Sequence, residues 1–88
     1  MTEFKVDVVW KKQDEDRFVD SQFYRGHQWK FDGGITVDAS PSPHVVPLPL
    51  SCEEAVDPEE AFVAAISSCH MLTFLAIAAK RRYVVLTY

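Results

Sequence analysis

Hydrophobic and polar residues alternate near the start of the chain, and this alternation predicts a β-strand. Over residues 3–10, Phe4, Val6, Val8 and Trp10 fall on one face, while charged residues fall mostly on the other. A period of two is typical of a strand with one buried face. Residues 11–21 are charged and show little periodicity, so we expect a loop there.

Two more strands are predicted, over residues 22–31 and 35–39, because Asp32-Gly33-Gly34 between them is typical of a tight turn. One face of the first of these strands is mostly aromatic but also holds Arg25 and His27. Residues 40–50 contain four prolines. Proline excludes a helix interior and a central strand, so we expect a stiff connector.

A long helix is predicted over residues 58–81. Asp57 can cap its start, Pro58 suits the first helical position, and Glu60 completes a capping box. Apolar residues surround the helix on nearly all sides, so we expect it to be buried.

The last residues, 83–88, are rich in β-formers and predict a further strand. Together these elements predict one α+β domain over residues 1–88, in which an antiparallel sheet packs on a long central helix.

Composition narrows the possible functions. The chain has 88 residues and a net charge of −4, with no long basic run, so we expect no nucleic-acid partner. Met1–Lys12 lacks the apolar core of a signal peptide, and the apolar stretch Met71–Ala79 is too short to span a bilayer. We therefore expect a cytoplasmic protein without membrane contact, whose two cysteines are free thiols.

Arg25 and Cys69 are the residues most suggestive of chemistry. A guanidinium on an apolar face is costly unless an anion meets it, and a structural carboxylate or a position at the sheet edge would also satisfy Arg25. Cys69, in the middle of the helix, has the ordinary interpretation of a small core residue. If Cys69 is reactive, its thiolate needs a cation from elsewhere, because the helix dipole fades within the first turn. Arg25 is the candidate.

Glu59 could orient that guanidinium through a bidentate contact, although a first-turn acid is also favoured by the helix dipole alone. Ten residues of straight helix separate Glu59 from Cys69 by about 15 Å. One arginine cannot easily bridge both in a single chain. Either the helix is broken, or Glu59 reaches the site from a second subunit, and we prefer the second subunit.

A metal site is not expected. His27 and His70 could join Cys69, but a structural zinc site usually has four ligands, often in closely spaced pairs, and no such set is found. We interpret His27 as a satisfied inward-facing histidine or as a polar group lining the same pocket as Arg25. Cys52 follows the prolines in a polar loop, where an exposed free thiol is expected.

Three segments, FYRGHQWKFDGG, ASPSPHVVPLP and VDPEEAFVAAISSCHMLTFLAIAAKRRYVVLTY, closely resemble the N-terminal half of the OsmC/Ohr family of osmotically induced and organic-hydroperoxide-resistance proteins. The resemblance implies an intertwined homodimer with its sites at the subunit interface. It also implies a thiol-dependent peroxidase, without a cofactor, that reduces organic hydroperoxides and is regenerated by a dithiol reductant.

By position, the resemblance implies that Cys69 is the peroxidatic cysteine, Glu59 the glutamate of the Pro-Glu motif and Arg25 the activating arginine. We expect His27, Trp29 and Phe62 to contact the substrate, since apolar side chains around the site would favour alkyl hydroperoxides.

Two departures from the family pattern matter. The sequence ends at Tyr88, before the half in which the family has its resolving cysteine, and Cys52 does not align with that cysteine. The alternative function is therefore a non-catalytic dimerisation or redox-sensing fragment of the same fold. Arg82 also stands where related sequences tend to have glycine, and a left-handed conformation there would cost about 1 kcal/mol.

Overall fold

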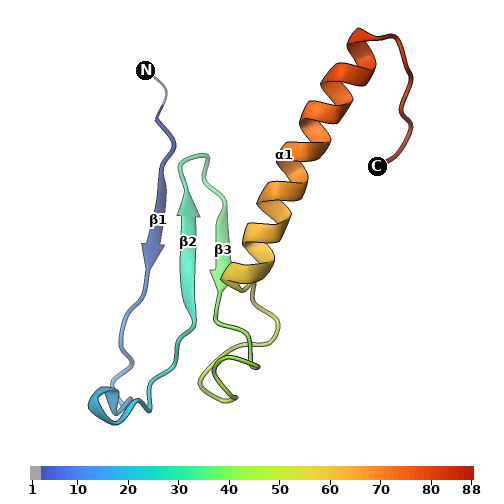
Figure 1. Ribbon diagram of the computed structural model, residues 1–88. Coiled ribbons are helices and arrows are strands. Elements are labelled where there is room, and N and C mark those ends of the chain that lie inside the picture. Colours follow the sequence, from blue (N-terminus) through green and yellow to red (C-terminus); the bar gives the residue numbers. More distant parts are fainter. Residues whose placement is uncertain (1–2) are drawn as a thin grey trace. The chain divides into compact units, whose positions relative to one another are not determined.

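The computed structural model describes residues 3–88 and divides the chain into two compact units. The first unit ends at Pro58 and contains the sheet, and the second comprises Glu59–Tyr88 and contains the long helix (Figure 1). The two units are described separately. One antiparallel sheet and one long helix make the chain an α+β structure, as the alternation and the capping signals predict.

The sheet has three strands in the order β1-β2-β3, and both neighbouring pairs are antiparallel (Figure 1). Its strands are β1 (Val6–Val9), β2 (His27–Phe31) and β3 (Thr36–Ala39). In the register, Trp29 of β2 lies opposite Val8 of β1 and Val37 of β3. Gly34, in the turn between β2 and β3, has φ +100°, a conformation that favours glycine.

The strand β2 begins at His27, five residues later than the predicted start at 22. The backbone N–H of Arg25 donates to the carbonyl of Leu50 at 2.9 Å, so this stretch bonds to the connector instead of joining the ladder. The other two strands are also shorter than predicted, since β1 spans only four residues of the expected 3–10 and β3 starts one residue late.

The proline-rich connector contains neither helix nor strand, as predicted, but it is folded tightly onto β3. Val56 forms a parallel bridge with Ala39. Ser40 is fully buried: its hydroxyl accepts from the N–H of Cys52 at 2.8 Å and donates to the carbonyl of Pro41 at 2.8 Å. The hydroxyl of Ser40 is therefore satisfied both as a donor and as an acceptor in the interior of the sheet unit.

The loop between β1 and β2 is also ordered by specific contacts. The indole N–H of Trp10 donates to the carbonyl of Tyr24 at 2.9 Å, which joins the two ends of the loop. The loop contains one short 3-10 helix, η1 (Phe18–Asp20), which is followed by Ser21 in a left-handed conformation. This agrees with the loop expected for residues 11–21.

The helix α1 spans Pro58–Lys80 without interruption, within one residue of the prediction. It ends in a Schellman motif, in which the N–H of Arg82 donates to the carbonyl of Ala79 and the N–H of Tyr83 to that of Ala78. Arg82 has φ +63°. This is the left-handed conformation that was considered for Arg82 because related sequences tend to have glycine at its position.

Burial of α1 differs from the prediction. Only Ala78 of the helix is buried, while Phe62, Leu72 and Ile77 are 68%, 60% and 51% exposed.

The helix also has the length and composition of a membrane span, with a mean hydropathy of 1.9 over its best 18-residue window. The core helix of a soluble protein has the same properties. Met71–Ala79 alone was too short, but the apolar residues of the preceding turns lengthen the segment.

Residues 83–88 form no strand in the described part of the chain, contrary to prediction. After the Schellman motif they turn back beside α1 (Figure 1). The hydroxyl of Tyr88 lies 2.8 Å from Nδ1 of His70, and its ring centroid is 6.1 Å from that of Phe74.

Candidate functional site

Arg25 precedes β2, and its guanidinium contacts two carbonyl oxygens and an aromatic ring. Its Nη1 donates to the carbonyl of Ser21 at 3.0 Å and to that of Phe23, and its Cζ lies 3.6 Å from the centroid of the Phe23 ring. This is a cation–π contact. Carbonyl oxygens and an aromatic face, instead of the structural carboxylate considered from the sequence, therefore satisfy part of the guanidinium.

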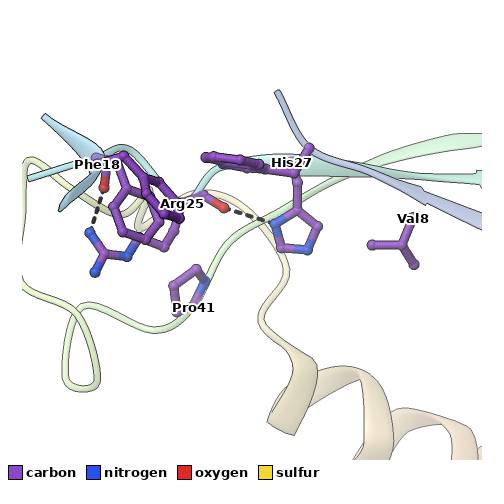
Figure 2. Close-up of a pocket in the computed structure, with 7 residues that line it drawn as sticks. Val8, Phe18, Arg25, His27 and Pro41 are labelled. Carbon is purple, nitrogen blue, oxygen red and sulfur yellow. Dashed lines mark hydrogen bonds between the residues drawn. The ribbon is translucent and has the colours of Figure 1, made fainter. Parts of the chain in front are cut away.

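Arg25 lines an apolar pocket of about 480 Å³ in the sheet unit. The other lining residues are Val8, Trp10, Phe18, Phe23, His27 and Pro41. Figure 2 shows two hydrogen bonds among them, from Arg25 to the carbonyl of Phe23 and between Nδ1 of His27 and the carbonyl of Arg25, the latter at 2.8 Å. The pocket combines a mostly apolar wall with two basic side chains, which is typical of a small-molecule site.

Cys69 is a free and exposed thiol on α1. Phe62 lies seven residues earlier, two turns along the same helix face, and is 68% exposed. The nearest basic residue of the helix, apart from the adjacent His70, is Lys80, eleven residues or about 16 Å away along the axis. The helix itself therefore provides Cys69 with an apolar neighbour for a substrate but with no permanent cation.

The predicted catalytic residues are divided between the two units. Arg25 belongs to the sheet unit, whereas Glu59 and Cys69 belong to the helix unit. Because α1 is unbroken, Glu59 and Cys69 remain about 15 Å apart along its axis. Of the two alternatives weighed from the sequence, the broken helix is thus wrong, and a contribution of Glu59 from a second subunit stays a prediction.

A second pocket, of about 310 Å³, lies in the sheet unit and is lined by Tyr24, Cys52 and His27 among others. Burial, and after it a hydrogen bond with Cys52, raises the pKa of the Tyr24 phenol, and the charges of Asp38 and Glu54 act in the same direction. The Cys52 thiol is half-buried and lies 3.5 Å from Oε2 of Glu54. Cys52 is therefore a free thiol, as expected, but it is half-buried instead of exposed.

Two further expectations concern Trp29 and metal binding. Trp29 lies on β2 with its ring centroid 6.3 Å from that of His27, but it is not among the described residues that line the larger pocket. Among residues 3–88 the structure contains no group of three or more His, Cys, Asp or Glu side chains suited to a metal ion.

Sequence reasoning missed three aromatic residues of the larger pocket, Trp10, Phe18 and Phe23. Their ring centroids are 4.7 to 6.0 Å apart, so they form one cluster. Phe18 carried a usable signal, because a large apolar residue in a charged loop commonly packs against something. Nothing local connects Tyr24 with Cys52, since 27 residues and the whole connector separate them.

No protein-family model matches the chain, and no curated protein matches it. Among solved structures, the chain is similar to an OsmC-like protein of unknown function from Vibrio cholerae O1 biovar eltor, strain N16961. The two share 61% sequence identity with a TM-score of 0.93, and the match covers 99% of this chain. The chain spans about half, 56%, of the length of the Vibrio chain.

Proposed function

The chain belongs to the OsmC-like family, and from that premise we propose that it provides the peroxide-reducing half of a thiol-dependent peroxidase acting on organic hydroperoxides. The observation that supports this most is the exposed thiol of Cys69 in the middle of α1. A thiol buried in a core would be inert, whereas this one is accessible to a small peroxide.

In the proposed reaction the Cys69 thiolate attacks the terminal oxygen of the hydroperoxide. A sulfur–oxygen bond forms as the oxygen–oxygen bond breaks, and the alkoxide leaves as an alcohol after taking up a proton. Cys69 becomes a sulfenic acid. A dithiol reductant then gives two electrons, which returns the thiol, releases water and leaves the reductant as a disulfide.

Arg25 has the role of stabilising the thiolate and the charge that develops on the peroxide oxygens. Its Nη1 is engaged by two carbonyls, while Nη2 and Nε add further donors to the same planar group. Since no permanent cation lies near Cys69 on its own helix, Arg25 supplies the missing charge. Glu59 of a second copy would orient the guanidinium, which makes the active form a homodimer.

The exposed apolar surface of α1 supports association more directly than it supports catalysis. Phe62, Leu72 and Ile77 are all more than half exposed, which is unusual for a helix of a monomeric soluble protein. A non-catalytic dimerisation or redox-sensing role of the same fold is the second candidate. In either role we place the protein in the cytoplasm, with α1 as a core helix and neither membrane nor nucleic acid as a partner.

The test is peroxide consumption by the chain with cumene hydroperoxide and dithiothreitol, together with the mass of the peptide that contains Cys69. If the chain is a peroxidase, we expect repeated turnover. Cys69→Ser should abolish this turnover, and Cys52→Ser should retain it. A gain of one oxygen on Cys69 without turnover would favour the sensing role. An unmodified Cys69 after peroxide treatment would contradict both.

A further inference from the structure

Tyr24, the residue before Arg25, has both of its backbone groups held by side chains from other segments. Its N–H donates to Oδ2 of Asp16 at 3.2 Å, and its carbonyl accepts from the indole N–H of Trp10 at 2.9 Å. The next N–H along the chain, that of Arg25, donates to the carbonyl of Leu50 at 2.9 Å. Three segments therefore fix the backbone from which the Arg25 side chain starts.

The carboxylate of Asp16 also closes a turn at the start of the loop between β1 and β2. The same Oδ2 atom accepts from the N–H of Gln13 at 3.2 Å, and the N–H of Asp16 donates to the carbonyl of Gln13 at 3.1 Å. One oxygen therefore links the first turn of the loop to Tyr24 at its end. A carboxylate suits this position, because a backbone N–H bonds more strongly to an ionised acceptor than to a neutral one.

The segment between Asp16 and Tyr24 contains the groups that hold the guanidinium. Nη1 of Arg25 donates to the carbonyls of Ser21 and Phe23, and Cζ of Arg25 lies 3.6 Å from the centroid of the Phe23 ring. If Tyr24 lost its bond to Asp16, the two carbonyls and the ring would no longer be fixed relative to the backbone of Arg25. The position of the guanidinium thus depends on a carboxylate nine residues earlier in the chain.

We propose that Asp16 is a positioning residue of the peroxidase site, which holds the Arg25 guanidinium in place through the backbone of Tyr24. Its carboxylate contacts backbone N–H groups, and Asp16 is not among the described residues that line the pocket beside Arg25. It therefore acts through Arg25 and not on the peroxide. The consequence for catalysis rests on the proposed function, whereas the effect on the position of Arg25 does not.

The first test observes Arg25 itself by nuclear magnetic resonance, in the full chain labelled with a heavy nitrogen isotope. The Nε–Hε signal of Arg25, identified by its absence in Arg25→Ala, reports the contact with the Phe23 ring, because an aromatic face shifts nearby protons upfield. We expect Asp16→Ala to move this signal to the position of an exposed arginine. Asp16→Asn should keep it, since one amide oxygen can accept from both N–H groups. Asp14→Ala, which removes an exposed carboxylate from the same loop, is the matched control and should also keep it.

The second test measures peroxidase kinetics with cumene hydroperoxide. Asp16→Ala should lower kcat/KM about tenfold, because a displaced catalytic group loses part of its effect. Asp16→Asn should restore the rate to within about twofold of wild type, as its amide oxygen replaces the acceptor. In the Arg25→Ala background, Asp16→Ala should cause no further loss, because two residues that act through one group are not additive. An equal loss in both backgrounds would show a general structural role and would overturn the inference.

The inference is also overturned if the Arg25 signal of folded Asp16→Ala stays at its wild-type position, or if Asp16→Asn or Asp14→Ala displaces it as much. If circular dichroism shows that Asp16→Ala does not fold, Asp16→Ser takes its place, because the serine hydroxyl is too short to accept from both N–H groups.

The inference and the proposed function fail separately. A displaced Arg25 signal in Asp16→Ala, with no peroxidase activity in wild type, would keep Asp16 as the residue that positions Arg25 and would remove the proposed function. Turnover that Asp16→Ala leaves unchanged would keep the proposed function and remove the role of Asp16 in it.

Discussion

The two units of the chain differ in how completely they satisfy their own side chains. In the sheet unit, Ser40, Arg25 and His27 each have hydrogen-bond partners within the unit, and an aromatic cluster fills one side of a pocket. In the helix unit, Cys69 is exposed and no permanent cation lies near it on α1. The pocket of the sheet unit is formed by the unit's own residues, whereas the proposed nucleophile on α1 depends on groups from elsewhere.

The largest expected effect concerns the cation that is missing near Cys69 on α1. Arg25→Ala should lower kcat/KM for cumene hydroperoxide on the order of 100-fold, as for loss of one preorganised donor to a developing charge. Arg17, which forms an exposed ion pair with Asp20, is a matched control in the same loop, and Arg17→Ala should retain the rate. Equal rates for the two variants would mean that Cys69 obtains its charge from another group.

The second prediction compares two serines, one from each unit. Ser40→Ala removes a fully buried hydroxyl and leaves the N–H of Cys52 without its acceptor, so unfolding free energy should fall by about 1–3 kcal/mol. Ser68 is exposed on α1, and Ser68→Ala should change stability by less than about 0.5 kcal/mol. Urea unfolding followed by tryptophan fluorescence reports the sheet unit, which contains both tryptophans, and circular dichroism reports the helix. Similar losses for both variants would contradict the burial of Ser40.

Local signals predicted the helix well and the sheet less well. The start of α1 followed from Asp57, Pro58 and Glu60, which act on their own neighbours. The start of β2 did not follow from alternation, because the backbone N–H of Arg25 bonds to Leu50, 25 residues later. The half-burial of Cys52 depends on Tyr24 in the same way. Contacts across long separations leave no periodic trace in the sequence.

The third prediction concerns the end of the helix. Arg82 adopts φ +63° in the Schellman motif, where a side chain costs about 1 kcal/mol relative to glycine. Arg82→Gly should therefore stabilise the helix unit by about that amount, measured by thermal unfolding at 222 nm. Arg81→Gly, one residue earlier and without positive φ, should be neutral or destabilising. The opposite order would show that the motif is not formed in solution.

The smallest effect is the alkaline dependence of the sheet unit. Burial, and then the hydrogen bond with Cys52, raises the pKa of Tyr24. Its contribution is fully present below pH of about 10, where the unfolded phenol ionises, and is lost as pH rises through the folded-state pKa. Tyr24→Phe should flatten the fall of the melting temperature above that pH, whereas Tyr83→Phe, at an exposed tyrosine, should not. Parallel wild-type and Tyr24→Phe curves would contradict the raised pKa.

The connector between β3 and α1 has a consequence for how the sequence can vary among relatives. Its prolines give it the composition of a linker, and a linker usually tolerates substitution and changes of length. Ser40 and Ser51 are buried, however, and the carbonyl of Leu50 holds the backbone of Arg25. Pro47 and Pro49 are exposed, so substitutions at these positions should be tolerated among relatives. The two serines and the spacing between them should be retained as strictly as core residues.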